Sequence, residues 1–261
     1  MENNAVLAEM RGKVLILTIN RPQNGNAIVP AVTQGFEEAL ADAANNPDVA
    51  AVIVTGAGEK IFCGGMDLKF LAENGVEAAQ GIAGEHGFAG MTRREDFPKP
   101  LIAAVNGAAM GGGTEIALAC DLIVCAEHAK FGLPEVKRGL LASAGGPIRM
   151  LRQLPRALAY ELVLTGNPIT AQQALQYHLV NRVVPKEQLL DEALKLAEEI
   201  SCNAPLSIRY SKELLIYAQE HSLEESFVKN DEVSEIVFSS EDSVEGPRAF
   251  AEKRAPVWKG R

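Results

Sequence analysis

Two glutamates of this chain stand in unusually apolar surroundings. Glu115 lies in the segment MGGGTEIALACD, residues 110–121, and Glu135 lies in AKFGLPEVKRG, residues 129–139. A carboxylate among glycines, alanines and leucines is costly to desolvate, so it either keeps a raised pKa or is held by specific donors. Two such groups brought together predict acid–base chemistry on a small molecule.

Two glycine-rich loops each follow a predicted strand and precede a predicted helix. The first is FCGGMDL, residues 62–68, and the second is NGAAMGGG, residues 106–113. Glycine lets the backbone approach a ligand closely, and the start of a helix presents unpaired N–H groups. Two helix starts from adjacent strand ends can direct two N–H donors at one oxygen, which is the geometry of an oxyanion hole.

Each of these features has a simpler explanation when it is taken alone. A glycine triplet is more often a tight turn or a site of close helix packing, and Glu115 can interact with the start of its own helix. Glu135 follows Pro134 and can be an ordinary loop carboxylate. Neither loop is a nucleotide-binding motif, because GAAMGGG lacks the GxGxxG spacing and no GK[ST] occurs. The catalytic interpretation therefore depends on the joint arrangement.

The elements that must position these loops follow from periodicity. Extended or continuous apolar runs, which predict strands, occur at residues 5–9, 14–20, 49–55, 101–105 and 122–125. Arg11-Gly12 between the first two runs predicts a hairpin, and helical spacing of apolar residues predicts a helix over 30–44. Strand, glycine turn and helix alternate to about Pro185, the pattern of an α/β core with a mostly parallel sheet.

Helix-forming residues dominate the C-terminal part of the chain. Amphipathic periodicity predicts helices over residues 187–200, 205–221 and 223–238, and a short one near 247–253. The apolar faces of these helices need a partner surface, which indicates assembly. We therefore predict an α/β catalytic core over residues 1–190 and a helical oligomerisation region over residues 191–261.

Composition and charge limit the function classes. The 261 residues are 47% hydrophobic and 23% charged, which is normal for a globular protein. The net charge of −9 argues against a nucleic-acid partner, which needs a basic face. The N-terminus lacks the apolar segment of a secretory signal, and the apolar stretch 101–126 is interrupted by Asn106, Glu115 and Asp121. We expect a cytoplasmic protein with neither a signal nor a membrane span.

Cysteines and histidines give no sign of a metal site. Cys63, Cys120, Cys125 and Cys202 form no CxxC pair, so neither zinc nor a disulfide framework is indicated. We expect all four to be reduced core residues. The four histidines are scattered without metal-ligand spacing and without a serine or cysteine context for nucleophilic catalysis. No metal and no separate cofactor are expected.

The joint arrangement resembles the enoyl-CoA hydratase/isomerase family, the crotonases, essentially from end to end. The elements that carry the resemblance are NRP at 20–22, FCGGMDL at 62–68, AVNG at 104–107, GGGTE at 111–115, FGLPE at 131–135 and KRAP at 253–256. The fold implied is a crotonase-like spiral of ββα units with a C-terminal helical trimerisation region. The implied substrate is an acyl-CoA thioester, of which coenzyme A is a part, and the implied assembly is a homotrimer or a dimer of trimers.

The resemblance also implies a role for each matching residue. The backbone N–H groups of Met66 and Gly112 would hold the thioester oxygen, and Glu115 and Glu135 would flank a water and the alkene. Further residues implied to bind coenzyme A or the acyl group are Asn26, Ala27, Ile28, Gly64, Asp67, Lys69 and Ser143. Lys69 is equally well explained as an exposed solubilising lysine. The glycine-rich residues 75–90 resemble the segment that covers the acyl site in relatives, with a flexible surface loop as the alternative.

Departures from the family pattern concern the substrate more than the reaction. Many similar hydratases have a proline and a glycine where this chain has LASAGG, residues 141–146, and Met66 replaces the usual alanine. Residues 136–140, VKRGL, are more similar to variants that act on unusual acyl chains, including carnitinyl-CoA dehydratases. Retention of both glutamates favours a hydratase or dehydratase. The alternatives are an enoyl-CoA isomerase that uses one glutamate and a non-catalytic or RNA-associated member of the fold.

Overall fold

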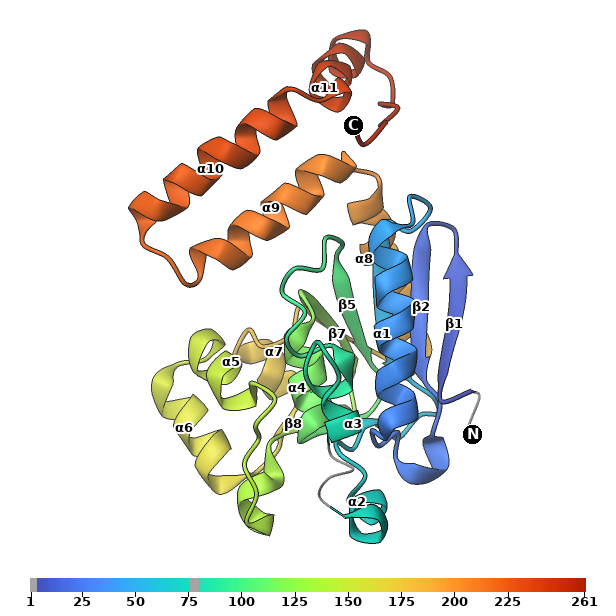
Figure 1. Cartoon of the computed structure of the whole chain (residues 1–261), viewed down its shortest axis with the longest axis vertical. Coiled ribbons are helices and arrows are strands. Elements are labelled where there is room, and N and C mark those ends of the chain that lie inside the picture. The colour runs from blue at the N-terminus through green and yellow to red at the C-terminus, as the bar shows by residue number, and fades with distance from the viewer. Residues whose placement is uncertain (1–3, 76–79) are drawn as a thin grey trace.

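Two β-sheets form the centre of the chain in the computed structural model, which describes residues 4–75 and 80–261 (Figure 1). In spatial order, the larger sheet contains β1 (Val6–Arg11), β2 (Val14–Ile19), β3 (Ala51–Gly56), β5 (Leu101–Val105), β7 (Leu122–Ala126) and β10 (Arg182–Val184). The smaller sheet contains β4 (Ile61–Cys63), β6 (Ala108–Met110), β8 (Lys130–Gly132) and β9 (Ile169–Thr170). The predicted hairpin and the predicted buried strands are confirmed.

The larger sheet is parallel except for its first strand. β1 and β2 pair antiparallel from Val6 opposite Ile19 to Arg11 opposite Val14, and every later neighbour pairs in parallel. Alternate residues of the inner strands pack into two separate apolar clusters, one on each face. α1 (Pro30–Asn45) covers one face and α8 (Leu189–Ser201) covers the other. Burial on both faces explains why these strands are continuous apolar runs.

The spiral consists of units that give one strand to each sheet. β3 and β4 precede α2 (Leu68–Asn74), β5 and β6 precede α4 (Gly112–Ala119), and β7 and β8 precede η4 (Pro134–Arg138). Because β4, β6 and β8 run parallel in neighbouring positions, their carboxyl ends meet at one edge of the small sheet. The loops that follow these strands, including both predicted glycine loops, are therefore brought side by side.

Shorter helices connect and cover these units. They are η1 (Pro22–Asn24), α3 (Gln80–Ala83), η3 (Phe88–Gly90), α5 (Gly146–Gln153), α6 (Arg156–Thr165), α7 (Ala171–Gln176) and η5 (Lys186–Gln188). α5 packs against both α4 and α6, so the turn that leads into α5 reaches the helix that carries Glu115. Of the described helices, none is both long and apolar enough to cross a bilayer.

The C-terminal helices stand away from the sheets (Figure 1). α9 (Pro205–Ala218) and α10 (Leu223–Phe238) form a helical hairpin, and α11 (Glu241–Glu252) follows. α8 spans the predicted boundary at residue 190 and packs on the sheet through Ala193 and Ala197. The helices that leave the core thus begin with α9, and the division of the chain into two parts stays a prediction.

The last helix begins earlier than the sequence indicated. Proline at 247 suggested a helix start, because proline favours the first helical turn. In the structure α11 already begins at Glu241, since the Ser240 hydroxyl accepts a hydrogen bond from the Ser243 N–H over 3.2 Å. Pro247 lies inside the helix. The expected helix near 247–253 is therefore present, but it begins six residues earlier and is longer than predicted.

The cysteines fit the prediction of reduced core residues with one exception. Cys63, Cys120 and Cys125 are buried free thiols, and burial raises the pKa of each to about 12. Cys202 is also free but exposed, because it follows the last turn of α8. Its carbonyl oxygen accepts a 2.7 Å hydrogen bond from the Trp258 indole, which ties the C-terminal tail to that helix end.

Candidate active site

Met66 and Gly112 lie at the meeting point of the first and second loops. Met66 pairs with Ile28 as a parallel bridge, in which the Ile28 N–H donates to the Gly65 carbonyl over 2.8 Å. A Cβ added to Gly65 would lie 3.0 Å from the backbone nitrogen of Gly112. The two loops are thus in direct contact, and only glycine fits at 65, where φ is also +89°.

The backbone N–H groups of Met66 and Gly112 are free to bind a ligand oxygen. In the described ranges, 4–75 and 80–261, no acceptor meets either group. Gly112 is the first residue of α4, so its N–H belongs to the unpaired first turn and gains from the helix dipole. Both properties suit an oxyanion hole, in which each donor is worth about 2.7–4 kcal/mol of transition-state stabilisation.

Glu115 lies in the first turn of α4 and is 3% exposed. Its Oε1 accepts a 2.8 Å hydrogen bond from the Gly146 N–H at the start of α5. Burial raises the pKa of Glu115 to about 7, and the charge of Glu135 acts in the same direction. The amides of Gly146 and Ala144 and the guanidinium group of Arg149 lower this pKa and so oppose the shift. A carboxyl group with such a pKa can accept or donate a proton near neutrality.

Glu135 faces the same helix start from the other side. A Cβ added to Gly111 would lie 2.6 Å from Glu135 Oε1, so the carboxyl group packs against the residue that precedes α4. Its Oε2 is buried and has no hydrogen-bond partner among the residues that the structure describes. Burial raises the pKa of Glu135, and its own amide and Arg138 oppose the shift. An unpartnered buried carboxyl oxygen is costly and indicates a site for a water or a substrate group.

Close packing holds the two glutamates in place. A Cβ at Gly113 would lie 2.0 Å from the Cys63 carbonyl oxygen, so α4 packs directly on β4. A Cβ at Gly146 would lie 2.9 Å from Glu115 Cγ. The GGG and AGG segments are therefore needed for close approach as well as for free N–H groups. The alternative explanation of the glycine triplet, close packing, is thus also correct.

Sequence reasoning missed two residues beside the site. The ring of Phe88 covers Gly112, because a Cβ there would lie 2.4 Å from the ring edge. Arg149 in α5 is largely buried and lowers the pKa of Glu115. The one available signal for Arg149 was a charged residue beside the AGG turn. Phe88 lies in the glycine-rich residues 75–90, which the resemblance connected with the cover of the acyl site, but no local pattern pointed to its ring.

The segment around Phe88 is packed more tightly than a surface loop. Ile82 and Ala89 are fully buried, and the Ile82 carbonyl accepts a 2.9 Å hydrogen bond from the Thr33 hydroxyl of α1. Ile82, Ala89 and Gly90 are thus part of the core, whereas residue 81 and residues 83–85 are exposed; the flexible surface loop stays an alternative for the exposed residues. Residues 76–79 of the predicted segment lie outside the described residues.

Two residues assigned to substrate binding have structural roles for their side chains. Asn26 is fully buried, and its amide donates to the carbonyls of Ala57 and Ile61 over 2.9 and 2.8 Å. Asp67 caps α2 by accepting from the N–H of Phe70, and it pairs with Arg21 over 3.0 Å. Burial would raise the pKa of Asp67, but these partners lower it overall. A ligand contact of either residue would have to use its backbone.

The remaining predicted ligand residues differ in exposure. Ile28 is buried, and Ala27 is half-buried, with its carbonyl bonded to Arg21 over 2.6 Å. Gly64, Lys69 and Ser143 are exposed. Lys69 is the second residue of α2, directly after the first loop. Its assignment to coenzyme A and that of Ser143 to the acyl group stay predictions.

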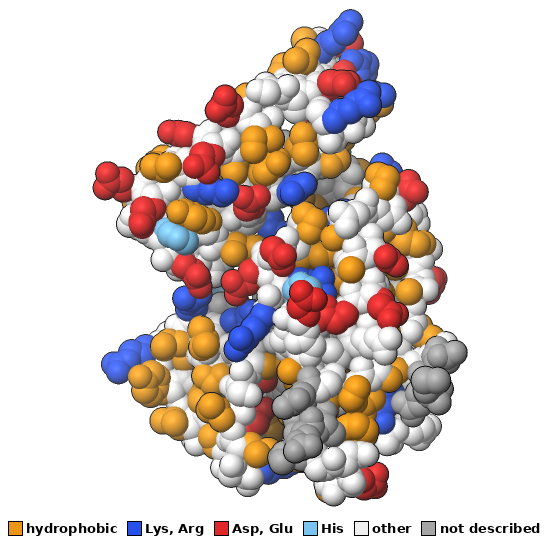
Figure 2. All heavy atoms as spheres, viewed as in Figure 1, with side chains coloured by type: hydrophobic (Ala, Val, Ile, Leu, Met, Phe, Trp, Pro, Cys, Tyr) orange, Lys and Arg blue, Asp and Glu red, His pale blue; other side chains and the backbone are white. Residues whose placement is uncertain are grey.

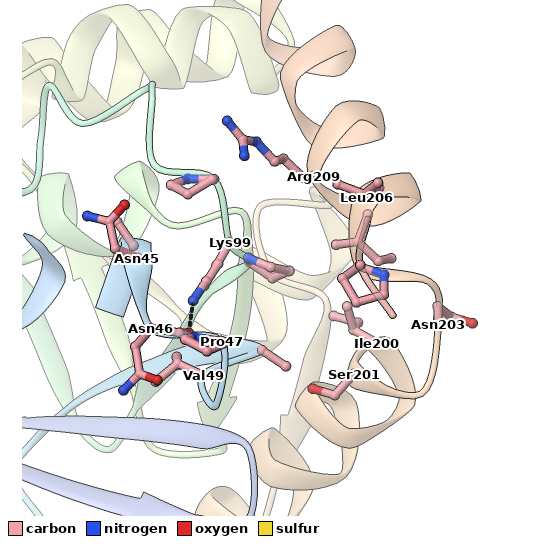
Figure 3. A pocket seen from close by; sticks show the side chains of 17 residues that line it. Asn45, Asn46, Pro47, Val49, Lys99, Ile200, Ser201, Asn203, Leu206 and Arg209 are labelled. Carbon is pink, nitrogen blue, oxygen red and sulfur yellow. Dashed lines mark hydrogen bonds between the residues drawn. The ribbon is translucent and has the colours of Figure 1, made fainter. Parts of the chain in front are cut away.

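A cavity of about 300 Å³ lies elsewhere in the chain (Figure 3). It is lined by the end of α1, by residues 98–100 before β5 and by the junction of α8 and α9. None of the four residues with predicted catalytic or oxyanion roles lines it. Lys99 points into this space but already donates to the carbonyls of Ala43 and Asn46. The cavity is thus separate from the candidate active site.

Known proteins similar to this chain share both its sequence and its fold. The family model described as Enoyl-CoA hydratase/isomerase matches residues 9–261. A carnitinyl-CoA dehydratase from Salmonella typhi is 44% identical over 254 residues, which cover 96% of each chain.

Solved structures agree over nearly the full length. An enoyl-CoA hydratase from Mycobacterium tuberculosis H37Rv is 42% identical with a TM-score of 0.93 and covers 98% of this chain and 99% of its own. A carnitinyl-CoA hydratase from Mycobacterium avium is 48% identical with a TM-score of 0.77 and covers 99% of this chain and 100% of its own.

Proposed function

The chain belongs to the enoyl-CoA hydratase/isomerase family, and on that premise we propose how its site performs the reaction. It is a hydratase-type carbon–oxygen lyase, which adds water across the 2,3-double bond of an acyl-CoA thioester or removes it. One observation supports our assignment of the site: the buried Glu115 and the half-buried Glu135, which has one buried carboxyl oxygen, flank the start of α4, where two backbone N–H groups meet no acceptor in the described residues.

The first step of hydration places negative charge on the thioester oxygen. The N–H groups of Met66 and Gly112 would donate to this oxygen as the enolate forms. Fixed donors in a dry site need no reorganisation during the reaction, so they stabilise the charged state more than the neutral ground state. Phe88 covers Gly112 and would help to exclude water from this oxygen.

The two glutamates would divide the proton transfers between them. Glu115 accepts a hydrogen bond from the Gly146 N–H, which favours its ionised form, so it would take a proton from the water whose oxygen bonds to C3. Glu135 has an unpartnered buried oxygen, which favours its protonated form, so it would give a proton to C2. The substrate thereby gains one water, Glu115 is left protonated and Glu135 ionised, and one proton must pass from Glu115 to Glu135 before the next turnover.

Two candidate substrates differ in the acyl group that is attached to coenzyme A. A short 2-enoyl group is sufficient for the proposed chemistry. A carnitine-derived acyl group is favoured by the 44% identity with a carnitinyl-CoA dehydratase and by residues 136–140. An isomerase would need only one of the glutamates, so the buried pair makes it the weaker alternative.

The test follows loss of the conjugated enoyl thioester absorbance with crotonyl-CoA and with crotonobetainyl-CoA. We expect hydration of at least one of them, and E115Q and E135Q should each lose about 10²-fold or more. Full activity of either variant would contradict the two-carboxylate mechanism. The preferred acyl group is the one with the higher kcat/KM. Added chelator should have no effect, because no metal or separate cofactor is part of the proposal.

We also propose a homotrimer or a dimer of trimers. Large apolar side chains are exposed on α9 to α11, among them Phe238 at 78% and Phe250 at 87%, and others on α5 and α6 include Ile148 and Leu164. Figure 2 shows such side chains above and below a hollow between the two groups of helices. Exposed patches of this kind indicate a protein partner. Sedimentation equilibrium measures the mass, and a monomer would refute the proposal.

Free thiols and an acidic charge support a cytoplasmic location without a nucleic-acid or membrane partner. Cell fractionation tests this location.

A further inference from the structure

We propose that Arg149 is a positioning residue, which holds the turn that binds Glu115 and couples this turn to the segment that covers the oxyanion hole. The proposal rests on the function proposed above. The hydrogen bonds of the Arg149 side chain go to backbone carbonyls and not to the two glutamates, so it acts through its neighbours.

The side chain of Arg149 bridges two segments that are far apart in sequence. Its Nη1 donates to the carbonyl of Ala144 over 3.3 Å, and its Nη2 donates to the carbonyl of Thr92 over 2.7 Å. Ala144 and Gly146 belong to the same turn, and the Gly146 N–H is the donor that holds Glu115. One guanidinium group therefore fixes both the turn that orients the carboxylate and a distant loop.

Local geometry makes arginine the suitable residue at this position. The side chain is 19% exposed, and its planar fork presents several N–H groups in fixed directions. Gly145 has φ of +99°, and a Cβ there would lie 2.3 Å from Arg149 Nη1. The glycine turn thus leaves room for the guanidinium group. A lysine would keep the charge but present a single ammonium group to two carbonyls.

Thr92 connects Arg149 with the other side of the active site. The Thr92 hydroxyl accepts a 3.0 Å hydrogen bond from the Phe88 N–H, and the Phe88 ring covers Gly112. The contacts therefore run from the Glu115 turn through Arg149 and Thr92 to the oxyanion hole. One side chain thus connects the group proposed to transfer a proton, Glu115, with the donors proposed to stabilise the enolate oxygen.

The covering segment is anchored independently at its other side. Glu37 of α1 pairs with Arg94, and His86 Nδ1 lies 2.6 Å from Glu37 Oε2. Arg94 also donates to the Gly90 carbonyl over 3.0 Å. Loss of Arg149 should therefore loosen the contact with α5 without releasing the segment from α1.

Charge adds to the geometric argument. The charged groups that act on Glu115 are Glu135 from η4, which raises its pKa, and Arg149 from α5, which lowers it. Arg149 is itself faced by Glu95, 3.8 Å away, by Glu115 of α4, by Cys120 directly after α4, and by Arg152 of its own helix. Removal of the guanidinium charge should raise the pKa of Glu115 further.

The test compares R149M and R149K with a matched control on the same helix. R152M removes an exposed arginine that pairs with Glu220 over 3.1 Å, outside the proposed contacts. Hydration kinetics are measured over about pH 5 to 9, which spans the pKa of Glu115, raised by burial to about 7. Thermal unfolding of each variant separates a loss of fold from a loss of positioning.

For R149M we expect the Glu115-dependent limb of the pH profile of kcat/KM to move to higher pH, because the guanidinium charge lowers the pKa of Glu115. Its kcat should fall about 10- to 100-fold, because a shift of about 1 Å in a positioned group has this effect. R149K should keep the pH profile of kcat/KM near its wild-type position but have a lower kcat. R152M should change neither the pH profile nor kcat. Wild-type kcat in R149K, or the same changes in R152M, would overturn the proposal.

A second readout does not depend on turnover. Carboxyl NMR of ¹³C-labelled glutamate follows the titration of Glu115, and E115Q assigns its signal. An upward shift of this titration in R149M supports the positioning role of Arg149. If the wild type hydrates neither acyl-CoA, that result refutes the proposed function but leaves the NMR test of Arg149 valid. An unchanged titration overturns the proposal. If R149M does not fold, the kcat of R149K decides.

Discussion

Gly146→Ala is the substitution with the sharpest expected effect on the site. The added Cβ would lie 2.9 Å from both Glu115 Cγ and Leu133 Cδ1, and 3.0 Å from Glu115 Oε1. Ordinary contacts of a Cβ begin at about 3.4 Å, so these atoms must move apart by about 0.5 Å. The backbone has no φ that excludes alanine here, so the effect comes from crowding alone.

Crowding at this point acts on catalysis and on stability to different extents. Overpacking a core site typically costs about 1–3 kcal/mol of folding free energy, which leaves most of the protein folded. The same displacement weakens the 2.8 Å hydrogen bond from the Gly146 N–H to Glu115. We expect kcat to fall about 10²-fold, because misplacement of a catalytic group by about 1 Å has this effect.

The assay pairs hydration kinetics with thermal unfolding of the same samples. Gly246→Ala serves as the control, because it adds the same methyl group at a helical position whose nearest side chain lies 3.4 Å away. The control should keep full activity and a similar midpoint of unfolding. Full activity of folded Gly146→Ala would refute the conclusion that this turn positions Glu115.

Three further predictions concern packing, a helix cap and the carboxyl pair. Gly113→Ala should prevent folding or destabilise strongly, because its Cβ would lie 2.0 Å from a backbone carbonyl of β4; recovery of soluble, cooperatively unfolding protein tests this. Asp67→Asn should cost about 1 kcal/mol at neutral pH through the weakened cap of α2. Since the folded-state pKa of Asp67 is lowered, its contribution to the free energy of unfolding is present above the unfolded pKa of about 3.9 and is lost as the pH falls through the folded pKa. The difference between wild type and Asp67→Asn in unfolding free energy, measured with denaturant, should therefore shrink in acid. An ionised Glu135 raises the pKa of Glu115, whereas the proposed mechanism has Glu135 protonated, so Glu135→Gln should leave the carboxyl NMR titration of Glu115 near its wild-type midpoint. A clear downward shift of that midpoint would contradict the assignment of Glu135 as the acid.

Periodicity and local composition determined much of the fold and of the site. Apolar runs predicted β5 at its observed bounds, and helical spacing predicted α1 and α10 closely. The apolar surroundings of Glu115 and Glu135 indicated carboxyl groups with raised pKa values, and both are raised. These features are local, because burial of a strand or helix face is written in the spacing of neighbouring residues.

Only the tertiary structure decided which distant groups act on these carboxylates. No local pattern pointed to the side chains of Phe88 and Arg149, which reach the site from other segments. The side chain of Asp67 is occupied by a helix cap and by Arg21. The parallel order of β4, β6 and β8 brings the loops together. Such contacts depend on side-chain directions and on the close approach of backbones across the fold, and no short stretch of sequence contains this information.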